Sequence, residues 1–213
     1  MSACRNGNTG SYGNTNERNI MAIRYMNKAV FIDKDGTLIE NVPYNADPDK
    51  IILTKGASEA LKLLKQYNFK LIIISNQPGV ALGYFKEKEL NAVNKKIQLL
   101  LKDAKVQLDD FYYCPHLPEG NIFPYNNHCN CRKPLPGLIL KAAEEHQVDL
   151  QNSWMIGDIL NDVEAGNAAG CKSILIDNGN ETEWILNEKR IPDFIVKEFS
   201  DAASAILSIK TLM

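Results

Sequence analysis

The 213-residue sequence has no long apolar run and no strong excess of charge of either sign. Its apolar stretches, such as residues 71–74, are far shorter than the roughly 18 residues that a membrane span needs, and the N-terminus has no apolar signal segment. Lys and Arg number 24 against 26 Asp and Glu, so the formal net charge is only -2 and gives no overall basic field for nucleic acid. We therefore expect a cytoplasmic protein whose partners include neither a membrane nor nucleic acid.

Cysteine is scarce and odd in number. Of the 5 cysteines, Cys114, Cys129 and Cys131 share one short segment. This distribution does not suit a framework of disulfides and favours a metal site in a reducing compartment.

The pattern of the chain changes near residue 28. Residues 1–27 are rich in Asn, Gly and Ser and show neither strand nor helix periodicity, so we predict a disordered N-terminal extension. Residues 28–213 have a length and composition that predict a single domain.

Within that domain, short apolar runs alternate with helical patterns. The runs are typical of strands buried on both faces and cover residues 29–32, 71–74, 111–113, 154–156 and 174–176. Residues 57–67 and 90–101 repeat apolar side chains at the spacing of a helix. This alternation predicts a three-layer α/β fold with a parallel sheet and helices on both faces, in which ligands bind beyond the carboxyl ends of the strands.

Two carboxylates follow the first predicted strand. Asp33 and Asp35 are two residues apart, and Gly36 lets the chain turn sharply after them. One carboxylate and one backbone carbonyl can then face the same cation while the second carboxyl group transfers protons. Asp-Gly pairs are also common in ordinary solvated turns, so this segment alone leaves both interpretations open.

Two further segments can bind an anion. Ser75, Asn76 and Gln77 follow the second predicted strand, where a hydroxyl and backbone N–H groups can hold a phosphoryl oxygen. Arg132 and Lys133 precede a predicted helix, whose N-terminus also favours an anion. An ordinary turn and a solvated basic pair are the alternatives.

The last such segment follows the strand at residues 154–156. Asp158 comes directly after the strand end. Asp162 lies four residues later, one helical turn further on, where its side chain can contact and orient the residues that bind the ligand. A capping or turn role for Asp158 is the alternative. All four segments nevertheless fall in order at successive strand ends, which is improbable by chance.

Together these segments resemble the four signature motifs of the haloacid dehalogenase (HAD) superfamily of phosphatases: residues 31–38 (FIDKDGTL), 75–77 (SNQ), 133–134 (KP) and 157–158 (GD). The resemblance implies a three-layer, Rossmann-like (HAD-like) fold, a catalytic Mg²⁺ and an aspartyl-phosphate intermediate. Asp33 is then the nucleophile and Asp35 the general acid and base.

The same resemblance assigns the remaining motif residues. Ser75 and Lys133 stabilise the phosphoryl group, and Asn76 and Gln77 contribute to substrate binding. Mg²⁺ is held by Asp33, the backbone carbonyl of Asp35 and Asp158.

A second metal site is predicted in the segment before Lys133. Cys114 and His116 are followed after 12 residues by Cys129 and Cys131, and three thiolates with one imidazole complete the closed tetrahedral shell of a structural zinc ion. Unligated thiols in a loop are the alternative, and the adjacent His128 is expected to be a bystander. Zinc binding would order the backbone that carries Arg132 and Lys133.

This loop is similar to one branch of the superfamily, the D-glycero-D-manno-heptose 1,7-bisphosphate 7-phosphatases and the histidinol-phosphatases. Its spacing resembles the heptose enzymes more closely, which implies a small sugar phosphate as substrate and a role in lipopolysaccharide or nucleotide-sugar biosynthesis. The resemblance also implies substrate contacts by Asn41, Tyr44 and Arg132. Ile159 departs from the branch, which usually carries a basic residue after the motif-four aspartate.

Three alternatives remain beside the heptose bisphosphatase. A histidinol-phosphatase shares the zinc loop, and a polynucleotide 3′-phosphatase shares the first two motifs but should carry a basic groove. A zinc-stabilised binding module without catalysis is the third, and the intact Asp33, Asp35, Lys133 and Asp158 disfavour it. We expect the chain to act as a monomer.

Overall fold

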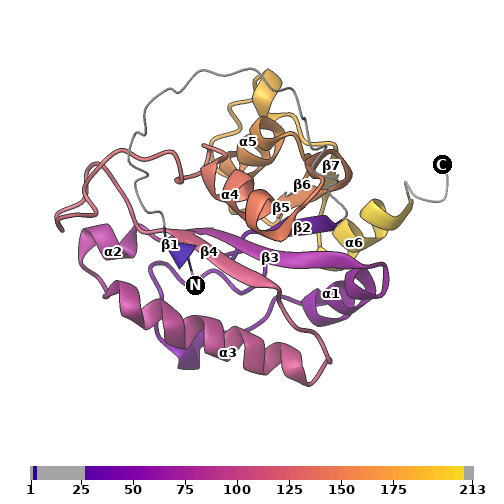
Figure 1. Cartoon of the computed structure of the whole chain (residues 1–213), viewed down its shortest axis with the longest axis horizontal. Helices are drawn as coiled ribbons and strands as arrows, with labels where there is room; N and C mark the ends of the chain where they lie inside the picture. The colour runs from indigo at the N-terminus through magenta and orange to yellow at the C-terminus, as the bar shows by residue number, and fades with distance from the viewer. Residues whose placement is uncertain (1, 4–26, 209–213) are drawn as a thin grey trace, which may run out of the picture.

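The computed structural model describes residues 2–3 and 27–208, and its centre is a parallel sheet. The seven strands of this described part lie in the order β1-β4-β3-β2-β5-β6-β7, with every neighbouring pair parallel (Figure 1). The strands are β1 (Ser2–Ala3), β2 (Lys28–Ile32), β3 (Phe69–Asn76), β4 (Asp110–Cys114), β5 (Trp154–Gly157), β6 (Lys172–Ile176) and β7 (Phe194–Val196). The five apolar runs are thus confirmed as β2 to β6.

Helices cover both faces of the sheet. They are α1 (Ala57–Gln66), α2 (Gly79–Leu82), α3 (Leu90–Lys102), α4 (Gly137–His146), α5 (Leu160–Ala169) and α6 (Phe199–Ser208). In Figure 1, α1, α3 and α6 lie on one side of the sheet and α4 and α5 on the other. This arrangement confirms the three-layer α/β prediction.

The alternation of side chains along β2 explains why both faces need helices. Val30 and Ile32 pack in the hydrophobic cluster formed with α1, α3 and α6, whereas Ala29 and Phe31 pack in the cluster formed with α4 and α5. Successive strand residues point to opposite faces, so a continuous apolar run is buried only when both faces are covered.

The strand order places the reversal of the winding at β2. The chain leaves β2 for β3 on one side, and β5 pairs with β2 on the other, so β2 and β5 meet where the winding reverses. Open α/β sheets bind ligands at such a point. Asp33 directly follows β2 and Asp158 directly follows β5.

The structure covers only parts of the predicted N-terminal extension. Ser2–Ala3 form β1 beside β4, and Asn27 bridges to Val148. The other residues of 1–27 lie outside the described part of the chain, so their disorder stays a prediction. Among the described helices, none has the length and apolar character needed to cross a membrane.

Candidate active site

Three buried carboxylates converge at the carboxyl ends of β2 and β5. Asp33, Asp158 and Asp162, which belongs to the first turn of α5, each bring an oxygen within 4.8 Å of the others. Burial raises the pKa of Asp33 well above its usual value, with the neighbouring carboxylates adding to the effect and Lys133 opposing it. Burial, followed by the charge of Asp162, raises the pKa of Asp158 to about 6. Burial and the neighbouring carboxylates thus both disfavour the ionised forms of Asp33 and Asp158 when no cation is present.

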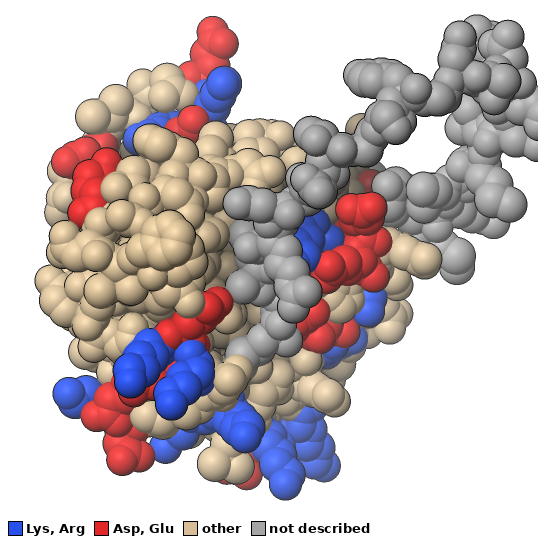
Figure 2. Space-filling model, turned by 60° about the vertical axis from the view of Figure 1, so that its left-hand side comes forward, with Lys and Arg blue, Asp and Glu red and all other residues tan. Residues whose placement is uncertain are grey.

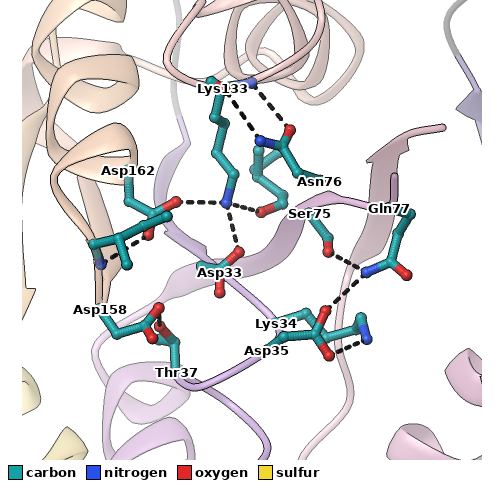
Figure 3. Close-up of polar contacts among 12 residues, drawn as sticks. Asp33, Lys34, Asp35, Thr37, Ser75, Asn76, Gln77, Lys133, Asp158 and Asp162 are labelled. Carbon is teal, nitrogen blue, oxygen red and sulfur yellow. Dashed lines mark hydrogen bonds and ion pairs between the residues drawn. The ribbon is translucent and has the colours of Figure 1, made fainter. Parts of the chain in front are cut away.

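Lys133 is the cation of this cluster. Its Nζ lies 2.5 Å from Asp33 Oδ1 and 2.5 Å from Asp162 Oδ1, and it donates to the Ile74 carbonyl at 2.9 Å (Figure 3). Burial opposes the charged ammonium, but Asp162 and Asp33 outweigh it and raise the pKa of Lys133. The lysine is therefore held protonated beside Asp33.

Asn76 fixes the backbone that presents Lys133. Its Oδ1 accepts from the Lys133 backbone N–H at 3.0 Å, and its Nδ2 donates to the Lys133 carbonyl at 3.0 Å. Asn76, at the end of β3, thus fixes the Lys133 backbone through hydrogen bonds on both sides of its Cα atom. A side-chain amide offers one donor and one acceptor, which is what this double contact requires.

Asp35 lies beside the buried cluster rather than within it. Its Oδ2 accepts from Gln77 Nε2 at 2.8 Å, and the same Gln77 nitrogen donates to Ser75 Oγ at 2.7 Å (Figure 3). Asp35 also lines a cavity of about 160 Å³, together with Asn41, Tyr44, Asn76 and Gln77. A carboxyl group at the edge of a cavity can exchange a proton with a molecule bound there.

Asp158 is oriented by two donors. Thr37 Oγ1 donates to its Oδ1 at 3.0 Å, and Asn180 Nδ2 donates to its Oδ2 at 2.8 Å. Gly36 has a φ of +86°, and a Cβ atom there would lie 2.2 Å from Asp158 Oδ2. The turn after Asp35 therefore needs glycine both for its left-handed backbone and for the close approach of Asp158.

The charges of the site match a divalent cation. Four carboxylates, those of Asp33, Asp35, Asp158 and Asp162, face the two buried ammonium groups of Lys34 and Lys133. Two negative charges are left when all six groups are ionised. Clustered carboxylate oxygens are the ligands that Mg²⁺ prefers, so this donor set fits that ion.

The cysteines and the histidine of the predicted zinc site also come together. The three sulfur atoms of Cys114, Cys129 and Cys131 lie 3.2–3.5 Å apart. His116 Nδ1 lies 3.5 Å from the Cys131 sulfur and 3.7 Å from the Cys114 sulfur. Burial raises the pKa of Cys114 to about 12 and lowers that of His116. Without a cation, burial thus favours the neutral thiol of Cys114 and the neutral imidazole of His116. Spacings of this size let one ion contact all four ligand atoms.

The structure brings most of the predicted residues together, and it places Arg132 at the Cys/His cluster. Arg132 Nη1 donates to the His116 carbonyl at 3.4 Å. Asn41 Nδ2 reaches Asn180 Oδ1 at 3.4 Å. The sequence motifs assigned no role to Lys34, Thr37 and Asn180. The rule that ligands gather beyond strand ends was the available signal for Asn180, since it follows β6.

Comparison with known proteins agrees with this geometry. A family model described as HAD-hydrolase-like matches residues 130–202. The D-glycero-beta-D-manno-heptose-1,7-bisphosphate 7-phosphatase of Escherichia coli K12 is 34% identical over 180 residues, which cover 80% of this chain and 94% of that protein. The chain belongs to the HAD-like phosphatase family.

Two other members of this family match over most of their length. The D-glycero-beta-D-manno-heptose-1,7-bisphosphate 7-phosphatase of Pasteurella multocida is 36% identical over 87% of this chain and 100% of its own. The crystal structure of D,D-heptose 1,7-bisphosphate phosphatase from B. bronchiseptica, complexed with magnesium and phosphate, has a TM-score of 0.71 at 28% identity. It covers 85% of this chain and 99% of its own.

The glycine after Asp35 gives a test of the geometry. We expect Gly36→Ala to lower the free energy of unfolding by about 2 kcal/mol or more, since a left-handed residue costs about 1–2 kcal/mol and the added Cβ also strikes Asp158. Chemical denaturation measures this change. Gly170→Ala is the matched control, because Gly170 has a φ of +90° and a Cβ atom added there would have no neighbour within 4 Å. A loss no larger than that of the control would contradict the close approach of Asp158.

Proposed function

We propose that this chain is a Mg²⁺-dependent phosphomonoesterase that removes the 7-phosphate of D-glycero-D-manno-heptose 1,7-bisphosphate. The observation that carries the proposal is the placement of Asp33 against Lys133 and Asp162, with Asp35 beside it at the edge of a cavity. The heptose is suggested by relatives of that name at 34% and 36% identity.

Asp33 is the proposed nucleophile. A carboxylate oxygen of Asp33 attacks phosphorus, and the bond from phosphorus to the sugar oxygen breaks while Asp35 gives its proton to that oxygen. Asp35 then takes a proton from water, which attacks the aspartyl-phosphate, releases inorganic phosphate and restores Asp33. Lys133, already 2.5 Å from Asp33, would stabilise the charge of the transferring phosphoryl group.

Mg²⁺ is the proposed cofactor, and Asp33, Asp158 and the Asp35 carbonyl would hold it. When bound, it supplies positive charge that offsets the repulsion between a carboxylate and a phosphate dianion. Ser75 contributes through its hydroxyl, which Gln77 holds at 2.7 Å. Asp162 contributes by keeping Lys133 in place.

The 160 Å³ cavity is the proposed position of the leaving group, because Asp35 must reach the leaving oxygen and lines this cavity. Asn41, Tyr44, Asn76 and Gln77 line it too, which supports the substrate contacts expected of them. Amide groups and a tyrosine suit the hydroxyls of a sugar. In Figure 2, acidic and basic side chains adjoin one another around the rim of the face shown. The formal net charge of -2 favours a small substrate over a polynucleotide.

Substrate preference tests the proposal directly. We expect kcat/KM with Mg²⁺ to be highest for D-glycero-D-manno-heptose 1,7-bisphosphate among three esters, the others being histidinol phosphate and a 3′-phosphorylated oligonucleotide. Steady-state release of inorganic phosphate measures all three. A preference for either of the other esters would replace the heptose assignment.

Replacement of the nucleophile tests the mechanism. We expect Asp33→Asn to lower kcat by about 10³-fold or more, because an amide cannot form the acyl phosphate. The variant should fold, since Lys133 keeps Asp162 as an ion-pair partner. Phosphate release and thermal unfolding measure the two effects. The exposed Asp103 provides the control Asp103→Asn, and substantial turnover by Asp33→Asn would remove the assignment.

We also propose that zinc occupies the Cys/His cluster. The ligands would be Cys114, His116, Cys129 and Cys131. All three cysteines would be in the reduced form and would bind zinc as deprotonated thiolates. Cys131 directly precedes Arg132 and Lys133, so closing the cluster would order the loop that delivers Lys133 to Asp33. The zinc proposal is supported by the close spacing of the four ligand atoms, which all lie within 4.8 Å of one another.

Removal of one ligand tests the zinc proposal. In reducing buffer, we expect Cys129→Ser to lower zinc affinity by more than about 10-fold and to reduce thermal stability and kcat together. Bound zinc, melting temperature and turnover are measured on the same sample. Cys171→Ser is the control, since Cys171 is a buried free thiol outside the cluster. A zinc-free Cys129→Ser protein with full activity and stability would contradict the proposal.

A further inference from the structure

Lys34, between the two motif aspartates, is a fully buried lysine. Its side chain is 0% exposed, and its Nζ lies 2.5 Å from Asp35 Oδ1. Lysine is almost never fully buried unless its charge is paired, because an isolated ammonium in the interior loses its hydration. The ion pair with Asp35 therefore accounts for the charge of Lys34 in this position.

The two buried lysines of the site serve different carboxylates. Lys133 lies between Asp33 and Asp162, whereas Lys34 pairs with Asp35 (Figure 3). The phosphoryl-binding part of the site thus has one ammonium and the proton-transferring part has another. The Lys34 ammonium contacts the Asp35 carboxylate, so we expect Lys34 to affect the reaction through Asp35.

Asp35 is held at both of its oxygens. Lys34 Nζ donates to Oδ1 at 2.5 Å, and Gln77 Nε2 donates to Oδ2 at 2.8 Å. An aspartate side chain turns about only two bonds, so two fixed donors define the plane of its carboxyl group. Each oxygen has a second lone-pair position, and the Asp35 side chain remains 29% exposed, so the group can still exchange a proton at the cavity.

We propose that Lys34 is a positioning residue, which holds the Asp35 carboxyl group in the orientation from which it protonates the leaving oxygen. The inference rests on the proposed function, in which Asp35 is the proton donor. Misplacement of a reacting group by about 1 Å can lower a rate by about 10²-fold, so the contact bears directly on catalysis.

Esters with different leaving groups can distinguish a positioning role of Lys34 from a purely structural one. An alkyl oxygen is a poor leaving group and needs the proton of Asp35 as its bond to phosphorus breaks. The p-nitrophenolate ion leaves without protonation. Loss of the Lys34 contact should therefore slow transfer from an alkyl phosphate much more than transfer from p-nitrophenyl phosphate.

The experiment compares kcat/KM of Lys34→Met and the wild type on both kinds of ester with Mg²⁺. We expect a loss of about tenfold or more for the alkyl ester and of less than about threefold for p-nitrophenyl phosphate, given that general acid catalysis contributes about 10²–10⁴-fold. The heptose, histidinol and oligonucleotide esters all have alkyl leaving oxygens. The test therefore holds whichever of them the wild type prefers, and failure of the heptose assignment stays separate from failure of this inference.

Lys65→Met is the matched control. Lys65 on α1 also lies 2.5 Å from an aspartate, Asp109, and its replacement should leave the ratio between the two esters unchanged. If Lys34→Met does not fold by circular dichroism, the same comparison is made with Lys34→Gln. Equal losses on both esters, or no loss on either, would overturn the positioning role.

Discussion

The shared ion pair of Lys133 with Asp33 and Asp162 is the interaction on which the arrangement of the site depends. Both distances are 2.5 Å, and all three groups are buried. A buried charge is tolerated only with a partner of opposite sign, so the buried Lys133 ammonium needs at least one of these carboxylates, and each carboxylate is stabilised by Lys133. This requirement joins β2, α5 and the loop before α4 at one point of the sheet.

The loop that carries Lys133 is long and depends on contacts at several places. Asn76 forms hydrogen bonds with the backbone N–H and the carbonyl of Lys133. Cys131, the last residue of the Cys/His cluster, directly precedes Arg132 in the chain. A polar loop has few ways to order itself by burying apolar surface. Under the proposed function, a metal ion bound at the cluster would restrict the positions that the Lys133 side chain can adopt.

Much of the architecture could be predicted from periodicity and from strand ends. The runs at 29–32 and 154–156 are buried on both faces, and their sequences are apolar throughout, so β2 and β5 were predictable. The short α2 and the three-residue β7 were not predicted, because segments of that length hold too few residues to show a period. Their conformation depends on the elements beside them.

The same division holds within the site. Asp33, Ser75 and Asp158 lie at or directly after the ends of β2, β3 and β5, and parallel strands place their carboxyl ends at one edge, so the sequence predicted that they would meet. Lys133 lies beyond the end of β4, and the loop between β4 and α4 brings it to the same edge. The pairing of Lys34 with Asp35 was not predictable, since neighbouring residues in a chain need not have side chains in contact.

The sequence by itself determined which groups are present, in what order they occur and which edge of the sheet receives them. Only the tertiary structure decided which side-chain donor contacts which carboxylate. Lys133 pairs with Asp33, 100 residues away in the chain, and Asn180 donates to Asp158 from the loop after β6. The physical reason is that apolar periodicity sets the positions of backbone elements. Side-chain pairing at distances near 2.5–3.0 Å depends instead on how those elements pack against one another.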